Sequence, residues 1–269
     1  MQKDRLDSAQ DILTHGLVAR FEATIGAVET GGYAPHGLHW CLAPPTIPMD
    51  DLGADGHPKK IAGFPEIALP RRMWASSDVE FLTPLQIGAK IHRISEVAGV
   101  EHKPGSSGEL VFVRVLHQTF AEGQLSVRET QTLVYRAAAT EKAPLPAASG
   151  FTGGDFDFLS ALTPTPQLLF RYSALTFNTH RIHYDADYAK REEAYPALVV
   201  HGPLMASLLL RFATQKLGHS AIKTFAFKGR SPAYCGQQLH LTMKLGGGQH
   251  ELSAMGADGR LVMSATIGT

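Results

Sequence analysis

The sequence predicts an α+β fold made of two similar halves, each with antiparallel strands wrapped around a helix. Four strand-like runs separated by turn residues lie in the first half, and four more come after a strongly apolar helix in the second. A P-x-x-x-G-x-x-I/L pattern also stands between strands in both halves, at Pro84–Ile91 and at Pro232–Leu239. Because the two matches have equivalent positions among the strands, they indicate an internal duplication.

The composition agrees with this fold and excludes several classes of protein. The 269 residues include 25 Lys and Arg against 25 Asp and Glu, so no net charge attracts nucleic acid or an acidic membrane surface. Hydrophobic residues make up 44% of the chain, which suffices for a core, yet no run approaches the roughly 20 apolar residues of a membrane span. Cys41 and Cys235 lie far apart without metal-ligand spacing, so we expect a cytoplasmic protein without disulfides or a structural zinc.

The first half, residues 1–137, begins with a predicted amphipathic helix that runs from Ser8 or Asp11 to Ile25. Residues 30–70 are rich in Gly, Pro and His and lack periodicity, which indicates a long loop, and loops of this length usually have a function. The separation of helix and strands makes this half the degenerate one. Its predicted strands are Trp74–Phe81, Lys90–Val100, Leu110–Ala121 and Leu125–Ala137.

Residues 138–166 contain Ala, Pro and Gly without a clear pattern, which indicates a linker. The second half, residues 167–269, opens with an apolar run at Leu168–Leu175 that reads as a strand. A helix from Gly202 to about Leu217 is apolar almost all round and is therefore expected to be buried. The strands predicted after it are Ala221–Arg230, Gln237–Leu245, Gln249–Met255 and Leu261–Ile267. A buried helix wrapped by an antiparallel sheet, presented twice, is a double hotdog.

One segment, residues 170–185, concentrates the groups that can carry chemistry. It holds two His, two Arg, one Asn and one Asp, more ionisable groups than a core strand would bury unpaired. His201 and Gly202 stand about eighteen residues after His183, at the predicted start of the apolar helix. Free backbone N–H groups at a helix start can stabilise a developing oxyanion. A base and an anion-binding site could therefore face each other here.

At these residues the chain resembles the MaoC-like enoyl-CoA hydratases. In its two-half layout it resembles the mesaconyl-CoA and itaconyl-CoA hydratases and the type-2 hydroxyacyl-thioester dehydratases. The signature of the family reads about Y/F-x-x-L/I/V-S-G-D-x-N-P-L/I/V-H, and residues 172–183 occupy it with matches at Leu175, Ile182 and His183. Residues 198–204, LVVHGPL, match the second motif of the family at the start of its central helix.

The departures from the signature are informative. Asn178 stands where the general hydratases have their catalytic Asp, His180 where they have Asn, and Arg181 where they have Pro. This form is similar to the mesaconyl/itaconyl-type branch. In the first half, HWCLAP at 39–44 and LPRRMW at 69–74 resemble segments of the same branch, so the resemblance covers nearly the whole chain.

The resemblance implies a hydro-lyase that reversibly adds water to the C=C bond of a short α,β-unsaturated acyl-CoA. It points to a C4–C5 dicarboxylic substrate such as mesaconyl-CoA or itaconyl-CoA, with coenzyme A as part of the substrate and no further cofactor or metal. Whether coenzyme A or an acyl-carrier protein bears the acyl group stays open, as does a homodimer. Two other classes stay open on this fold: a thioesterase, against which Asn178 argues mildly, and a non-catalytic acyl-thioester-binding protein.

Hydration requires a base for water, a proton for the α carbon and a donor for the thioester oxygen. The resemblance assigns the base to His183, while Asn178 holds the water and the Gly202 N–H polarises the carbonyl. Because Asn178 cannot exchange a proton, Asp185 is a candidate for the second acid–base group. Asp78 and Glu80 of the first half are the alternatives.

Other polar and aromatic residues are candidates for binding the substrate. Arg71, Arg72, Arg171 and Arg181 could bind the phosphates of coenzyme A or be solvated surface charges. Asp185 and His201 are equally compatible with capping helices, and Trp40 with closing the end of a barrel. We expect the carboxylate of the substrate to meet Arg171 or Arg181. The substrate-binding candidates are His180, Arg181, Arg171, Tyr172, His201, Trp40, Arg71 and Arg72.

Overall fold

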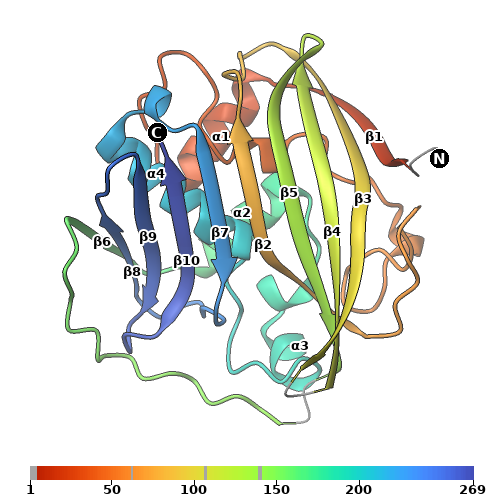
Figure 1. Cartoon of the computed structure of the whole chain (residues 1–269). Coiled ribbons are helices and arrows are strands. Elements are labelled where there is room, and N and C mark those ends of the chain that lie inside the picture. Colours follow the sequence, from red (N-terminus) through yellow and green to blue (C-terminus); the bar gives the residue numbers. More distant parts are fainter. Residues whose placement is uncertain (1–4, 62, 106–107, 139–140) are drawn as a thin grey trace.

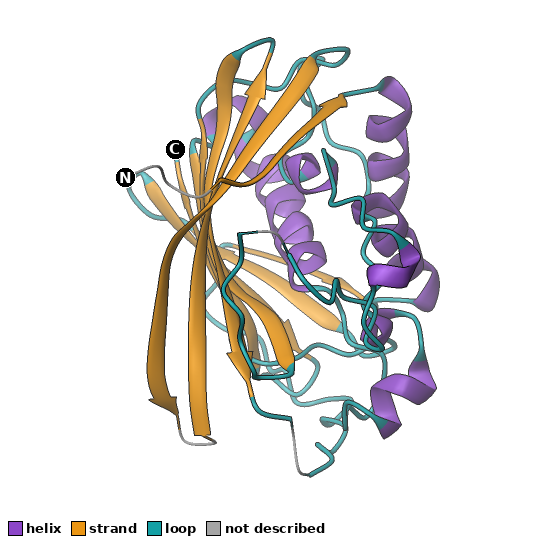
Figure 2. Cartoon of the chain, turned by 90° about the vertical axis from the view of Figure 1, so that its right-hand side faces the viewer, coloured by secondary structure: helices purple, strands orange, loops and turns teal. Residues whose placement is uncertain are grey.

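The computed structural model describes residues 5–61, 63–105, 108–138 and 141–269. In this part of the chain, ten strands form one antiparallel sheet, and the helices lie on one face of it (Figures 1 and 2). The elements of the first half are β1 (Arg5–Ile12), α1 (His15–Ile25), the 3-10 turns η1 (Leu38–Cys41) and η2 (Met49–Asp51), β2 (Arg71–Phe81), β3 (Lys90–Gly105), β4 (Gly108–Ala121) and β5 (Gln124–Arg136).

In the second half, one short strand and the helices come before the last four strands. The elements are β6 (Phe158–Leu162), α2 (Pro166–Thr176), the 3-10 turn η3 (Arg181–His183), α3 (Ala186–Arg191), α4 (Gly202–Leu217), the 3-10 turn η4 (His219–Ala221), β7 (Thr224–Gly229), β8 (Leu239–Lys244), β9 (Gln249–Gly256) and β10 (Leu261–Gly268).

The strand order shows the duplication directly. The order across the sheet is β1-β3-β4-β5-β2-β7-β10-β9-β8-β6. Counted from either outer edge, each half therefore places its first, third, fourth, fifth and second strand in that order. The halves join where β2 pairs with β7, from Ser76 opposite Lys228 to Glu80 opposite Thr224. The double hotdog is confirmed.

The repeated P-x-x-x-G turns lie at equivalent places and show why the first half is degenerate. Gln86 and Tyr234, each two residues after the Pro, form isolated β-bridges with Tyr33 and Val199. From Val199 the chain continues into the sixteen residues of α4, whereas from Tyr33 it continues into the four residues of η1. A single turn thus stands in the first half where the second has its central helix.

One continuous core lies between the sheet and α4. Ten of the sixteen residues of α4 are buried, in agreement with its apolar pattern. Each fully buried Leu contributes on the order of 2 kcal/mol through removal of apolar surface from water. This core joins residues of both halves around the buried face of α4. Its largest contributions come from Leu204, Leu208, Leu209, Leu210 and Phe212.

Three predicted elements differ from the structure. Residues from Ser8 to Ile12 belong to edge strand β1, which pairs with β3, and α1 starts only after Thr14, whose hydroxyl caps the helix by accepting from Leu17 N at 3.1 Å. The run Leu168–Leu175 lies in α2, because Thr165 caps a helix that has Pro166 in its first turn. The segment 138–166, read as a linker, contains the short edge strand β6, which pairs with β8.

Candidate active site

The segment after α2 is an irregular stretch that carries the motif residues. Helix α2 ends where Phe177 adopts a left-handed conformation with φ of 50°. Asn178 N donates to Ser173 O at 2.9 Å, and Asn178 Oδ1 accepts from His180 N at 2.9 Å. The amide nitrogen of Asn178 makes no hydrogen bond to any of the described residues, so it can donate to a bound water.

His183 is fixed in one tautomer. Its Nδ1 lies 2.7 Å from the carbonyl oxygen of Val199, which can only accept, so Nδ1 carries the proton. Nε2 is therefore a free lone pair, and it has no partner among the described groups. Burial lowers the pKa of His183 to about 4, although the bond to Val199 opposes this shift. A neutral imidazole with an available Nε2 is suited to act as a base.

His201 packs directly behind His183. The two rings stack with centroids 3.6 Å apart and an interplanar angle of 20°. Nε2 of His201 lies 2.8 Å from Ser173 Oγ, so His201 does not cap α4 with its side chain. Tyr172 is fully buried, contacts the His201 ring edge-on and bonds Ser207. Tyr172 and His201 therefore form a buried layer behind His183.

The start of α4 offers a backbone donor beside this stack. Gly202 comes directly after His201 and is the first residue of the helix, where N–H groups lack intrahelical partners. The next residue is Pro203, which has no N–H, so the donor at Gly202 stands alone at this point of the first turn. An added Cβ at Gly202 would meet only Trp74 O, at 3.8 Å. The N–H of Gly202 can therefore be approached closely by a thioester oxygen.

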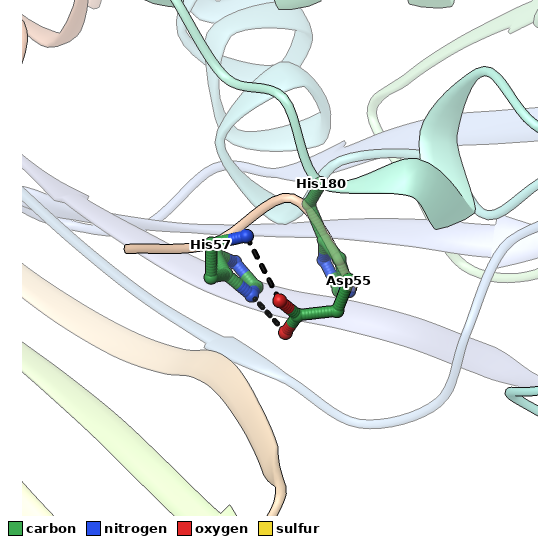
Figure 3. Close-up of side chains that lie close together, drawn as sticks. All are labelled: Asp55, His57 and His180. Carbon is green, nitrogen blue, oxygen red and sulfur yellow. Dashed lines mark hydrogen bonds and ion pairs between the residues drawn. The ribbon is translucent and has the colours of Figure 1, made fainter. Parts of the chain in front are cut away.

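Two residues that the sequence analysis did not single out complete the group. Figure 3 shows Asp55 and His57, from the long loop of the first half, beside His180. Asp55 accepts from His57 through both oxygens, from the backbone N and from Nδ1, each at 2.9 Å. The His57 ring lies 4.0 Å from that of His180, which in turn meets His183 edge-on at 5.4 Å. The only hint in the sequence was the position of Asp-Gly-His inside an unusually long loop.

The loop is fastened to the motif at a close approach of two backbones. Gly56 has φ of +88°, and a Cβ there would lie 1.8 Å from Thr179 O, so only glycine fits. Thr179 Oγ1 donates to Gly56 O at 2.6 Å, and the backbone N of Arg181 donates to Asp55 O at 2.9 Å. These contacts hold Asp55 and His57 in place against His180.

The electrostatics of the group depend on burial and one carboxylate. Burial lowers the pKa of His180 to about 2 and places the pKa of His201 well below its usual value, with neighbouring imidazoles acting in the same direction. Burial lowers the pKa of His57 as well, but here the bond to Asp55 opposes the shift. Burial opposes ionisation of Asp55, yet the hydrogen bonds from His57 lower its pKa on balance. Of these imidazoles, His57 is the one with a hydrogen-bonded carboxylate.

Donor atoms of Asp55, His57 and His180 lie within 4.8 Å of one another, a spacing that a metal ion could bridge. However, both oxygens of Asp55 already accept hydrogen bonds from His57, and the His57 and His180 rings pack against each other at an interplanar angle of 37°. The arrangement is that of a hydrogen-bonded Asp–His pair stacked on a third residue.

Arg181 and Asp185 have structural roles. Asp185 caps α3 by accepting from Tyr188 N at 3.0 Å, and its other oxygen accepts two bonds from Arg181. The Arg181 guanidinium also donates to Ala54 O at 3.0 Å and lies over the Tyr188 ring. Both oxygens of Asp185 are thus engaged, and Arg181 secures the first-half loop, so these contacts favour structural roles for the two residues.

The remaining arginines divide into two kinds. Arg71 forms an ion pair with the buried Glu193 and is a structural link to the end of α3. Arg171 is exposed on α2 and donates to Ala23 O of α1 at 3.2 Å. Burial is the main cause of the lowered pKa values of His57 and His180, and the charge of Arg72, on β2, contributes to both. Arg72 is therefore the arginine whose charge reaches the imidazoles.

Trp40 and the acidic residues of β2 lie outside this group. Trp40 is buried, donates through Nε1 to Glu129 at 3.1 Å and packs edge-on against Trp74, which agrees with a closing role. Asp78 is exposed, and Glu80 forms an ion pair with Arg128 at 3.0 Å. Neither acidic side chain is placed to serve as the second acid–base group.

A double hotdog whose central helix begins beside a tautomer-fixed His, with a free Asn amide in the same segment, fits a hydro-lyase of acyl thioesters. Comparison with known proteins assigns the chain within that class. Residues 36–235 match the family of hydroxyacyl-thioester dehydratase type 2, and the chain belongs to this MaoC-like family. Reversible hydration of an acyl thioester is the activity of the class.

The relatives agree with this assignment. The chain is 38% identical to a mesaconyl-C(4)-CoA hydratase of Chloroflexus aurantiacus, over 93% of this chain and 88% of the other. It is 27% identical to a mitochondrial hydroxyacyl-thioester dehydratase type 2 of Schizosaccharomyces pombe, over 76% of each chain. The fold matches a MaoC-like dehydratase of Phytophthora capsici with a TM-score of 0.75 at 16% identity, covering 99% of this chain and 96% of that one.

A protein of Mycobacterium tuberculosis described as having a double hotdog fold matches with a TM-score of 0.59 at 15% identity, covering 98% of this chain and 93% of that chain. None of the described helices combines the length and apolar character that crossing a membrane would require.

Proposed function

We propose that the protein hydrates a short α,β-unsaturated acyl-CoA that carries a second carboxylate, such as mesaconyl-CoA or itaconyl-CoA, and catalyses the reverse reaction. The observation that carries the proposal is His183, with Nε2 free next to the start of α4. The name of the 38% identical relative supports the dicarboxylic substrate. Arg72 supports it independently, because a cation close to the imidazole group would suit a distal carboxylate.

Each residue of the site has a role in this proposal. His183 Nε2 takes a proton from water, and the amide nitrogen of Asn178 holds that water. The water oxygen then bonds to the β carbon, and charge moves onto the thioester oxygen, which the Gly202 N–H stabilises. Arg72 replaces Arg171 and Arg181 as the arginine proposed to orient the distal carboxylate, since the other two bond backbone carbonyls elsewhere.

The test is a panel of thioesters with the purified protein. Mesaconyl-CoA, itaconyl-CoA, crotonyl-CoA and the matching acyl-carrier-protein thioesters are followed by absorbance of the enoyl thioester and by free thiol. Loss of absorbance without thiol release, fastest for a dicarboxylic CoA ester, is the expected result. Thiol release would identify a thioesterase instead, and binding without turnover would identify a non-catalytic protein.

A further inference from the structure

Hydration needs two groups that exchange protons, and the motif of this chain supplies one. His183 can serve the oxygen of water, but Asn178 has no exchangeable proton to offer the α carbon. Asp185 is engaged by Tyr188 and Arg181, and Asp78 and Glu80 lie elsewhere on β2. Another group must therefore deliver the second proton.

Asp55 and His57 have the arrangement that this task requires. Nδ1 of His57 donates to Asp55, so its tautomer is fixed and Nε2 has no partner among the described residues. A carboxylate bonded to Nδ1 stabilises the positive charge that appears when Nε2 takes a proton, as in other Asp–His pairs of enzymes. Within the described part of the chain, His180, His183 and His201 bond no carboxylate, because their side chains meet a carbonyl, a hydroxyl or only other rings.

Contacts between the two halves hold Asp55 and His57 next to the motif segment. The pair contacts His180, which contacts His183, so both proton-exchanging imidazoles lie in one connected group. The close approach of Gly56 to Thr179 and the bond from Arg181 N to Asp55 O prevent the loop from moving away independently. The side chain of His57 is 19% exposed, which leaves room for a ligand at its open edge.

We infer that His57, supported by Asp55, is the second acid–base group of the site and exchanges the α proton of the thioester. This inference rests on the proposed function. In hydration, the O–H bond of water breaks, its proton goes to His183 Nε2, and the oxygen bonds to the β carbon. The π electrons pass to the enolate, which then takes the proton from Nε2 of the His57 imidazolium at the α carbon. His57 ends neutral and His183 ends protonated, and transfer of that proton between them restores the starting state.

The charges that face His57 come from three elements. Asp55 of the same loop favours the protonated form, while Arg72 of β2 and the imidazoles His180 and His183 of the motif segment disfavour it. Removing the carboxylate therefore leaves only groups that oppose protonation. In Asp55→Asn, the alkaline limb of the kcat/KM profile should move to lower pH, because the imidazolium is lost earlier.

The first experiment compares His57→Gln and Asp55→Asn with wild type on the best enoyl-CoA. His57→Gln should lower kcat by about 10²–10⁴, and Asp55→Asn by about tenfold together with the shifted alkaline limb. Asp55→Asn keeps a hydrogen-bond acceptor and is the more conservative fold control. A matched pair is the exposed His102–Glu109 contact at 2.7 Å on β3 and β4, whose His102→Gln and Glu109→Gln variants should match wild type.

The second experiment measures proton exchange at the α carbon separately from hydration. A saturated thioester such as succinyl-CoA has no C=C bond to hydrate, so deuterium uptake at its α carbon in D₂O reports proton exchange there alone. His57→Gln should abolish this uptake, whereas His183→Gln should retain it while losing hydration. Uptake that persists in His57→Gln, or hydration within about threefold of wild type in both loop variants, would overturn the inference. A wild-type protein that hydrates no enoyl thioester would contradict the proposed function instead.

Discussion

The two halves of the molecule share one strand order and differ in the segment that comes after the β-bridge to the repeated turn. In the second half the chain passes from Val199 into the sixteen residues of α4. In the first half it passes from Tyr33 into one turn and then into the long loop that reaches β2 at Arg71. At this place in the repeat, a full helix begins in the second half and a single turn in the first, and the long loop of the first half brings Asp55 to the motif.

The position in the first half that is equivalent to Gly202 has no helix start. Three residues after the bridging residue stands His36, where the second half has Gly202. His36 stacks on His219 at 4.1 Å, and burial lowers its pKa to about 3. The cavity that these two line has a volume of only about 90 Å³. The first half therefore lacks the helix start that stands beside His183, and it contributes Asp55 and His57 to the group in the second half instead.

The largest expected effect comes from replacing His183, the proposed base in the second half. His183→Gln should lower kcat by about 10²–10⁴, because the free Nε2 that takes the water proton is lost. His180→Ala should have a milder effect, since His180 has only ring contacts on either side. Steady-state hydration with folding checked by circular dichroism measures both. A larger loss at His180 than at His183 would exchange their roles.

A substitution at the contact between the halves should have the next largest effect. Gly56→Ala places a methyl group against Thr179 O and displaces the loop, so kcat/KM should fall by about 10–100-fold through misplacement of His57. Gly248→Ala is the matched control, because Gly248 has a similar φ of +91° with nothing within 4 Å of an added Cβ. Equal kinetics in the two variants would show that the loop does not serve the site.

Substrate selectivity tests whether Arg72 of β2 binds the distal carboxylate. Arg72→Ala should lower the ratio of kcat/KM for mesaconyl-CoA over crotonyl-CoA by about tenfold, the size of a lost charge-assisted hydrogen bond. Arg171→Ala should leave the ratio unchanged, because that side chain bonds Ala23 O on α1. If Arg72→Ala weakens both substrates alike, Arg72 binds the coenzyme A portion instead.

The smallest expected effect concerns stability. The pKa of His183 is about 4 in the folded protein and near 6.5 when unfolded, so the unfolded chain binds the proton more readily. The contribution of neutral His183 to the free energy of unfolding is fully present above pH 6.5. It declines as the pH falls towards 4 and is smaller by about 1 kcal/mol at pH 5.5. Urea unfolding should therefore show a smaller loss between pH 7.5 and 5.5 in His183→Gln than in wild type. The same loss in both would contradict the lowered pKa, and His102→Gln serves as the exposed control.

The sequence predicted the long, regularly patterned elements and missed the short ones. The apolar pattern of α4 and the alternation of the eight inner strands survive because packing on a core imposes a period. Strands β1 and β6 lie at the two edges of the sheet, where one neighbouring strand, and not a buried face, decides the structure. For α2, the apolar run alone fitted strand or helix, and Thr165 directly before Pro166 was the local signal that decided for helix.

The site residues also divide into those that a local motif predicts and those that only the fold brings together. His183, Asn178 and Gly202 belong to a contiguous motif and a helix start, which a sequence displays directly. The i,i+4 spacing of Arg181 and Asp185 in the sequence is typical of an ion pair, and it favours a structural role for both residues. Asp55 and His57 reach His180 only through a contact between residues more than a hundred positions apart, and no local pattern encodes such a contact.

The pairing of β2 with β7 within one chain gives evolution a freedom that a dimer of identical subunits lacks. In a symmetric dimer, every substitution that alters one pocket alters its twin. Here each half can change alone, so the first has one turn and a long loop where the second has α4. A gene duplication and fusion thereby converts two equal pockets into one pocket with two different suppliers of residues.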